Sequence, residues 1–153
     1  MPRDPAITSR MMAQVKHANT KPEMVLRKHL HRMGVRYRLQ AKDVFGKPDL
    51  AIAKYKLAVF VDGDLWHGNE HKLRGLASIE ALFPTNTSFW AEKIRANMAR
   101  DSLVNQRLTS EGWVVVRLWA SEISRDPTGA AQMVLDRLRS LKTARLSPPP
   151  SDH

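Results

Sequence analysis

Apolar residues recur every three or four positions in three stretches of the chain, and this spacing predicts three helices. The first begins at Thr20, which can cap it, has Glu23 at the capping-box position and stops at Gly34. The second is expected over about residues 88–111 and the third over about residues 128–141. Each helix has an apolar stripe with which it can pack against a core.

Apolar runs between the helices predict four strands. They cover residues 37–39, 50–53, 57–61 and 113–119, with Tyr55-Lys56 as a tight turn between the second and the third. The last run is almost continuously apolar, which is typical of a strand buried on both faces. The order helix, three strands, helix, strand, helix predicts an α/β sandwich with a mixed sheet.

A length of 153 residues fits one domain around one core, and an apolar fraction of 42% is ordinary for a globular protein. We expect the domain to cover residues 8–142, with segments 1–7 and 143–153 as flexible tails. No apolar run is long enough to cross a membrane, and the first residues lack the apolar part of a signal peptide, so we expect a cytoplasmic location. The absence of cysteine excludes disulfides and thiolate metal sites.

The charge of the chain favours polyanionic partners. Lysine and arginine number 25 against 15 aspartates and glutamates, which gives a formal net charge of +10. Basic side chains that neutralise phosphates release condensed counterions, so such an excess favours nucleic acid. The alternative is a basic surface that is only solvated.

Two acidic segments lie at the ends of predicted strands. Asp49 follows Gly46-Lys47-Pro48 and starts a strand, where it is either a turn residue or a metal ligand. The strand that ends at Phe60-Val61 runs directly into Asp62-Gly63-Asp64-Leu65-Trp66-His67-Gly68-Asn69-Glu70-His71. Oxygen ligands of this kind suit a hard cation such as Mg²⁺, and the alternative is a polar loop built on an Asp-Gly turn.

Asp101 lies on an otherwise apolar face of the second helix, together with Ile94 and Leu108. A buried carboxylate without a partner is costly, so Asp101 should have one. The partner is either a histidine or a nearby arginine such as Arg100 or Arg107.

Trp66 in the acidic loop and Trp90 at the start of the second helix have two interpretations. They are core residues, or they are apolar wedges of the kind that proteins insert between bases when they open a duplex.

Taken in order, these segments resemble the very short patch repair endonuclease family from about Thr8 to Leu141. The matching segments are Ser9-Arg10-Met11-Met12, Asn19-Thr20-Lys21-Pro22-Glu23, Gly46-Lys47-Pro48-Asp49, Phe60-Val61-Asp62-Gly63, Trp66-His67-Gly68, Phe89-Trp90-Ala91-Glu92-Lys93, Asn97, Arg100-Asp101, Gly112-Trp113 and Arg117-Leu118-Trp119. The resemblance implies a restriction-endonuclease-like three-layer sandwich. It also implies Mg²⁺-dependent, strand-specific nicking of double-stranded DNA 5′ to the thymine of a T:G mismatch.

The resemblance also implies how the metal is held. Asp49 would bind it, with two Mg²⁺ ions expected, and the backbone carbonyl of Val61 would assist. Glu23 would hold metal-bound water in addition to its capping role. Asp62, where some relatives have histidine, would add an oxygen ligand.

The same resemblance assigns the residues that act on the phosphate. His67 would activate the attacking water and Asp101 would orient it, and a neutral histidine is a suitable base at pH 7. Lys93 is expected at the DNA, and Lys47 is either a phosphate contact or a solvated surface residue.

Five residues are implied to enter the DNA. Leu65, Trp66 and Trp90 match an aromatic-rich wedge in the major groove, with leucine in place of the usual phenylalanine. Met12 and Val15 match an apolar insertion into the minor groove.

One departure from the family concerns a structural zinc ion that cysteine and histidine usually hold around this loop. The cysteine positions read Asp64, Asn69 and Ser121 here, and only His71 remains as a familiar ligand. We therefore expect no structural zinc. Packing of Trp66 and hydrogen bonds from Asp64 to loop amides or to His71 should hold the loop instead.

Two other functions remain open at this point. The chain is alternatively a nuclease of the same fold in a restriction or defence system, or a DNA-binding module without catalysis, although the intact Asp49, His67 and Asp101 argue against the latter. We expect a monomer with mismatch-repair or methyltransferase companions and no membrane partner.

Overall fold

The computed structural model describes residues 20–146, and the DNA-contact predictions for Met12 and Val15 lie outside this part of the chain. The strands β1 (Arg38–Leu39), β2 (Leu50–Ile52), β3 (Leu57–Asp62) and β4 (Val114–Trp119) form one four-stranded sheet in that order. β1, β2 and β3 pair antiparallel, whereas β3 and β4 pair parallel. The predicted mixed sheet is therefore confirmed.

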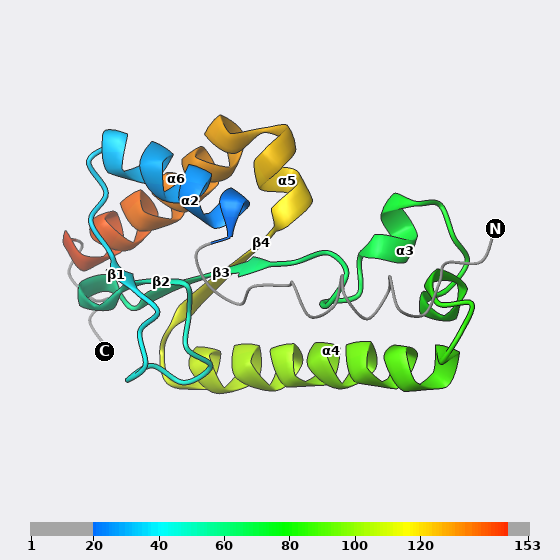
Figure 1. The fold of residues 1–153 in the computed structure, drawn as a ribbon. Coiled ribbons are helices and arrows are strands. Elements are labelled where there is room, and N and C mark those ends of the chain that lie inside the picture. The colour runs from blue at the N-terminus through cyan, green and yellow to red at the C-terminus, as the bar shows by residue number, and fades with distance from the viewer. Residues whose placement is uncertain (1–19, 147–153) are drawn as a thin grey trace.

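Helices cover both faces of the sheet, which gives three layers (Figure 1). The helices α2 (Lys21–Arg32), α5 (Ala120–Arg125) and α6 (Pro127–Leu146) pack on one another over one face, and α4 (Thr87–Ser110) lies along the other. This arrangement confirms an α/β sandwich consistent with a restriction-endonuclease-like fold. None of the helices in residues 20–146 is both long enough and apolar enough to cross a membrane.

The strand period decides which side chains face which layer. Leu57 and Val59 of β3, with Val116 and Leu118 of β4, belong to the core beneath α2, α5 and α6. Ala58 and Phe60 of β3 belong to the other core, which contains Val104 and Leu108 of α4. Arg117 is the register partner of Phe60, so it also lies on the α4 side.

The first predicted helix begins and ends close to the expected residues. Thr20 caps α2 and accepts a hydrogen bond from the Glu23 amide at 3.4 Å, and Gly34 follows the helix with φ +85°. Positive φ is the left-handed conformation that glycine adopts without strain. The second predicted helix, α4, is also confirmed within one residue at each end.

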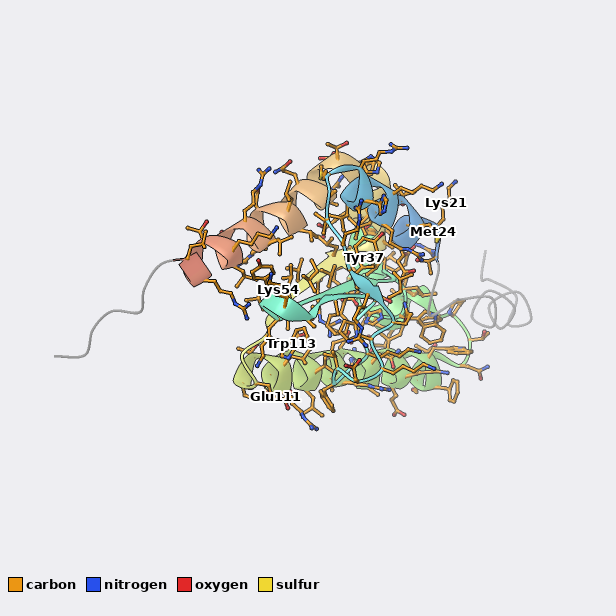
Figure 2. All side chains as sticks on the ribbon, turned by 90° about the vertical axis from the view of Figure 1, so that its left-hand side faces the viewer. Lys21, Met24, Tyr37, Lys54, Glu111 and Trp113 are labelled. Carbon is orange, nitrogen blue, oxygen red and sulfur yellow. The ribbon has the colours of Figure 1, made fainter. Side chains whose placement is uncertain are left out.

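The join between α4 and β4 is tied to the neighbouring strand. Figure 2 labels Glu111 and Trp113 at this join, on the side of the molecule that also carries Lys54 of the 3-10 helix η1 (Ala53–Tyr55). The Lys56 ammonium donates to the Glu111 carbonyl at 3.0 Å, and the Val114 amide donates to the Lys56 carbonyl at 2.8 Å. These contacts start β4 in register beside β3.

Several elements differ from the sequence prediction. The expected tight turn at Tyr55-Lys56 is η1, followed by Lys56 with φ +50°. Three short elements were not predicted: α3 (Glu70–Leu73) and the 3-10 helix η2 (Ile79–Leu82), which lie between β3 and α4, and α5. These segments have four to six residues, which is too short for a helical repeat of apolar positions to appear.

The last helix is longer than predicted. α6 continues to Leu146, four residues into the segment 143–153 that was expected to be a flexible tail. Residues 143–146 contain no glycine or proline, and alanine, arginine and leucine among them favour a helix. The tail was predicted from the proline-rich residues 148–150, and its expected start at residue 143 lies within α6.

Gly46 lets the chain turn into Pro48 and Asp49, and we expect its replacement to destabilise the fold. It has φ +80°, and a Cβ there would clash with the buried side chain of Val104. Gly46→Ala should lower the free energy of unfolding by about 2–4 kcal/mol, from backbone strain plus overpacking. Urea unfolding measures this.

Gly34→Ala is the matched control. Gly34 also has positive φ, but a Cβ there would meet nothing within 4 Å. It should cost about 1 kcal/mol, from strain alone. Equal losses in the two variants would contradict the packing of Gly46 against Val104.

Candidate active site

A pocket of about 620 Å³ opens where β3 ends, between the first turn of α2 and the middle of α4. Residues from distant parts of the chain line it. The residues of this lining that were predicted from the sequence as site residues are Glu23, Lys47, Asp49, Val61, Asp62, Trp66, His67 and Asp101. The structure therefore brings the nominated acidic residues and the histidine into one cavity.

Hydrogen bonds from Val61 and Gln40 hold Asp49 in the pocket. The Val61 amide donates to Asp49 Oδ2 at 2.7 Å, and Gln40 Nε2 donates to Asp49 Oδ1 at 3.2 Å. Gln40 Nε2 also donates to Glu23 Oε1 at 3.1 Å, so one amide group bridges the two acids. Gln40 was not predicted, because a glutamine at the end of a strand carries no sequence signal of this role.

The pair formed by Glu23 and Asp49 fits a divalent cation. Glu23 is 1% exposed, and burial raises the pKa of Asp49, as does the negative charge of Asp62. The Val61 amide, the Gln40 amide and a hydrogen bond with the Glu23 carboxyl group oppose that shift. A hard cation that prefers oxygen ligands would stabilise the charged form of these neighbouring carboxyl groups.

A second cluster surrounds His67. His67 Nδ1 lies 2.5 Å from Asp101 Oδ2 and 3.8 Å from Asp62 Oδ1. Burial lowers the pKa of His67, but the hydrogen bond to Asp101 and the charges of Asp62 and Asp101 outweigh it and raise that pKa. With Nδ1 donating to Asp101, the neutral ring has its lone pair on Nε2.

The partner of Asp101 is thus a histidine, as one of the two sequence alternatives proposed. The ion pair of Asp101 with an arginine involves Arg117 at 3.5 Å, and not Arg100 or Arg107. Arg107 pairs instead with Glu111. Arg117 comes from β4, so spacing along the second helix gave no sign of it.

The loop that carries His67 packs closely on α4. The Asn97 side-chain amide donates to the Trp66 carbonyl at 3.2 Å, one turn before Asp101 on the same helix face. Gly68 has φ +86°, and the Met98 side chain occupies the space that a Cβ on Gly68 would need. α4 therefore fixes both the loop and its carboxylate partner.

Asp64 ties the other side of this loop to α5. Its carboxylate accepts hydrogen bonds from the Asn69 side chain at 2.8 Å, from the Ser121 hydroxyl at 2.7 Å and from the Ser121 amide at 3.0 Å. The Asp64 carbonyl also accepts from the amides of Asn69 and Glu70. We call Asp64, Asn69 and Ser121 the Asp64 cluster.

The predicted hydrogen bonds between Asp64 and loop amides thus form with the amides donating to its carbonyl. Its carboxylate reaches Ser121 rather than His71. His71 Nδ1 is buried without a hydrogen-bond partner among residues 20–146.

The predicted wedge residues form an aromatic group beside the pocket. Trp66 is 9% exposed and packs in a core cluster with Ile79, Leu82, Phe83, Ala91 and Ile94, and Leu65 and Trp90 lie partly buried against it. Phe89, which was not nominated, is 61% exposed and packs edge-to-face on Trp90. Lys93 lies over the rings of both Trp66 and Trp90.

The fold and the pocket define a restriction-endonuclease-like protein with an acidic site at the end of β3, and comparisons with known proteins identify its family. The sequence profile described as DNA mismatch endonuclease Vsr matches residues 3–73. A Type II nicking enzyme V.HpaIIP of Haemophilus parainfluenzae is 41% identical over 117 residues, covering 76% of this chain and 79% of the relative.

Two further relatives extend this match. The Type II nicking enzyme V.NmeDIP of Neisseria meningitidis serogroup C is 39% identical over 135 residues, which is 88% of each chain. The DNA mismatch endonuclease Vsr of Escherichia coli strain K12 is 33% identical over 116 residues, which is 76% of this chain and 70% of the relative. The chain belongs to the Vsr family of DNA endonucleases, and it is a DNA nicking endonuclease. Membership of this family indicates a DNA substrate and a divalent metal ion.

We expect the purified protein to contain no stoichiometric zinc, because the Asp64 cluster offers one carboxylate and no thiolate. Elemental analysis measures the zinc content, and a zinc chelator should leave the melting temperature unchanged.

Asp64→Ala should lower the free energy of unfolding by about 2–3 kcal/mol, since it leaves the Ser121 amide and its neighbours unpaired.

Glu80→Ala is the control for loss of an acid, because Glu80 pairs with Arg95 at the surface and should matter little. One equivalent of tightly bound zinc in the purified protein would contradict the prediction that it contains no stoichiometric zinc.

Proposed function

We propose that the protein is a Mg²⁺-dependent endonuclease that nicks one strand of double-stranded DNA 5′ to the thymine of a T:G mismatch. The observation that supports this proposal is the placement of two complementary groups in one pocket. The carboxyl groups of Glu23 and Asp49 can hold a metal ion with its bound water. The pair of His67 and Asp101 can accept a proton. We further propose that it acts as a monomer in the cytoplasm, on nucleoid DNA.

Asp49 would hold the metal with the Val61 carbonyl as a further ligand, and Glu23 would hold metal-bound water. Bound Mg²⁺, in two ions as the family resemblance implies, supplies charge stabilisation to the phosphate and to the leaving oxygen. The Val61 amide and Gln40 keep the Asp49 carboxylate in one orientation. Because its orientation is fixed, the Asp49 carboxylate is already in place before DNA binds, and less entropy is lost when the site assembles.

His67 would take the proton from the attacking water at Nε2. Asp101 holds Nδ1, and thereby fixes both the tautomer and the orientation of the ring. When His67 becomes positive, the adjacent carboxylates of Asp101 and Asp62 stabilise it. The pair thus has the parts of a general base and its orienting group.

Recognition would use the aromatic group beside the pocket. Leu65, Trp66 and Trp90 are proposed to enter the stack next to the mismatch, which is easier to unstack than a paired step. Phe89 adds an exposed ring at the same end of α4. Lys93 and Lys47 are both exposed and are proposed to contact phosphates.

The function is tested with purified protein on otherwise identical T:G and matched duplexes, with and without Mg²⁺, on a denaturing gel. We expect a single nick 5′ to the mismatched thymine that requires Mg²⁺. Asp49→Ala should abolish nicking while DNA binding persists, because basic residues provide the phosphate contacts.

Asp43→Ala is the control for the loss of a carboxylate near β1, since Asp43 is exposed and pairs with Arg38. Cleavage by the wild type in excess chelator would refute the metal requirement. Equal cleavage of matched duplex would refute mismatch specificity.

His67 and Asp101 should behave as one unit in catalysis. His67→Ala should lower kcat by about 10²-fold or more, the usual contribution of a general base. His67→Ala combined with Asp101→Ala should be little worse than His67→Ala alone. Single-turnover kinetics measure these rates, with His31→Ala as a control for loss of an exposed histidine. Rates near wild type in both single variants would show that the pair is not catalytic.

Phe89 and Trp90 allow base stacking to be separated from core packing. Replacing either by alanine should weaken binding of a T:G duplex by about 1–3 kcal/mol and affect matched duplex less. Phe89→Ala should leave the fold stable because the ring is exposed, whereas Trp66→Ala should also destabilise the fold by about 3–5 kcal/mol.

Leu103→Ala, at an exposed apolar position on the same helix, is the control. Equal losses on both duplexes would assign the ring at that position to general contact rather than to the mismatch.

A second candidate is favoured by the names of the relatives, five of which are named Type II nicking enzymes. On this proposal the protein serves a restriction–modification system and a companion methyltransferase defines the sequence where it acts. Nicking of T:G mismatches placed in many sequence contexts would separate the two. A mismatch cut in one context alone, matching a methyltransferase encoded next to it, would favour the second candidate.

A further inference from the structure

Arg117 makes several polar contacts in the pocket, and the proposed function gives it no role. Its Nη1 donates to both oxygens of Asp62 at 3.0 and 3.1 Å, and its Nε donates to Asn105 Oδ1 at 2.6 Å. The same Nη1 lies 3.5 Å from Asp101 Oδ1, and Nη2 lies 3.5 Å from the Asp101 carbonyl. The guanidinium also lies 4.2 Å from the centre of the Phe60 ring.

These contacts fix the guanidinium in one place. Phe60 and Arg117 are register partners on β3 and β4, so the guanidinium lies over the ring of its neighbour across the strand pair. Asp101 and Asn105 are one turn apart on α4 and approach it from the opposite layer. The Arg117 side chain is only 17% exposed. A planar group with donors in a fixed fork suits such a site, whereas a flexible ammonium does not.

These contacts form a closed ring of four side chains that includes His67. His67 contacts Asp101, Asp101 contacts Arg117, Arg117 contacts Asp62, and Asp62 lies 3.8 Å from His67. Loss of Arg117 would leave two neighbouring carboxylates without a fixed cation between them. The orientation of Asp101, and with it that of His67, therefore depends on Arg117.

The same geometry changes the interpretation of Asp62. Ligand atoms of Asp62, His67 and Asp101 lie within 4.8 Å of one another, a spacing that also fits a metal ion. Both Asp62 oxygens, however, already accept from a permanently charged guanidinium. Asp62 is 6% exposed, so its charge needs such a partner within the fold.

We propose that Arg117 is a positioning residue that acts as a built-in cation, holding Asp62 and Asp101 so that His67 keeps its place, and that Asp62 is the counterion of Arg117 rather than a metal ligand. This inference rests on the proposed function of His67 and Asp49. It places the metal on the Glu23 and Asp49 side of the pocket alone. It also departs from the expectation that Asp62 adds a metal ligand.

Four proteins test the inference: the wild type, Asp62→Asn, Arg117→Met and the double variant. Arg117→Met should lower kcat about 10²-fold, as for a misplaced catalytic group, and leave KM for the duplex within about threefold. Asp62→Asn should lower kcat less, because its amide oxygen still accepts from Arg117. The double variant should be no slower than Arg117→Met, since both changes disrupt one unit.

The Mg²⁺ titration decides the role of Asp62. The Mg²⁺ concentration for half-maximal rate should stay within about twofold of wild type in Asp62→Asn. A rise of about tenfold or more there, as expected for loss of a metal ligand, would overturn the inference. Arg107→Met is the matched control, because Arg107 also stacks on a phenylalanine and pairs with a carboxylate but is 55% exposed. It should retain wild-type values.

A measurement without activity separates this inference from the proposed function. In metal-free protein, the Nδ1 proton that His67 shares with Asp101 should give a low-field NMR signal, identified by its loss in His67→Ala. The signal should persist in Asp62→Asn and be lost in Arg117→Met. Its persistence in Arg117→Met would overturn the positioning role, whereas a wild type that nicks no DNA would overturn only the proposed function.

If Arg117→Met does not fold, Arg117→Lys replaces it in both measurements. The ammonium group of the introduced lysine keeps the charge but cannot donate to Asp62 and Asn105 in the same fixed fork. We therefore still expect kcat to fall by at least about tenfold. A wild-type kcat in Arg117→Lys would overturn the inference.

Discussion

β3 and β4 run parallel through six consecutive residue pairs, from Leu57 with Val114 to Asp62 with Trp119, and helices cover both strands. This pairing determines where the groups of the pocket lie. It sends Val59 and Val116 into one core and brings Phe60 and Arg117 to the α4 side. A slip of one residue would exchange the two faces and bury the guanidinium among aliphatic side chains. The chemistry of the pocket therefore depends on a register that buried valines and leucines hold.

Much of the fold was predictable because its long elements have strong periodicity. α2, α4 and β4 begin and end within about two residues of the expected positions, since caps, glycines and apolar runs mark them locally. α3 and α5 were missed because a helix of one turn or so buries too few residues to show a pattern, and α5 has only Ile123 buried. The extra turns of α6 depend on helix propensity without burial, which a stripe of apolar residues does not reveal.

The pocket was predictable where one residue violated its local pattern. Asp101 on an apolar face required a partner because burying a charge is costly, and its contact with His67 is one of the two alternatives that this argument left open. Gln40 and Arg117 broke no such rule. An arginine within β4 has the appearance of an outward-facing strand residue, and its partners Asp62 and Asn105 come from other elements. Contacts of this kind depend on the tertiary arrangement of the sheet and α4.

The close packing of Met98 against Gly68 has a consequence for oxidative conditions. The chain has no cysteine, so thiol oxidation has no target in it. Met98 is 38% exposed, and its thioether fills the space beside Gly68, the residue after His67. Peroxide would convert this sulfur to a sulfoxide, which is larger and polar, in a position where the backbone leaves no room for a single additional carbon. Oxidation of Met98 would therefore disturb the loop beside His67, and a methionine sulfoxide reductase would reverse it.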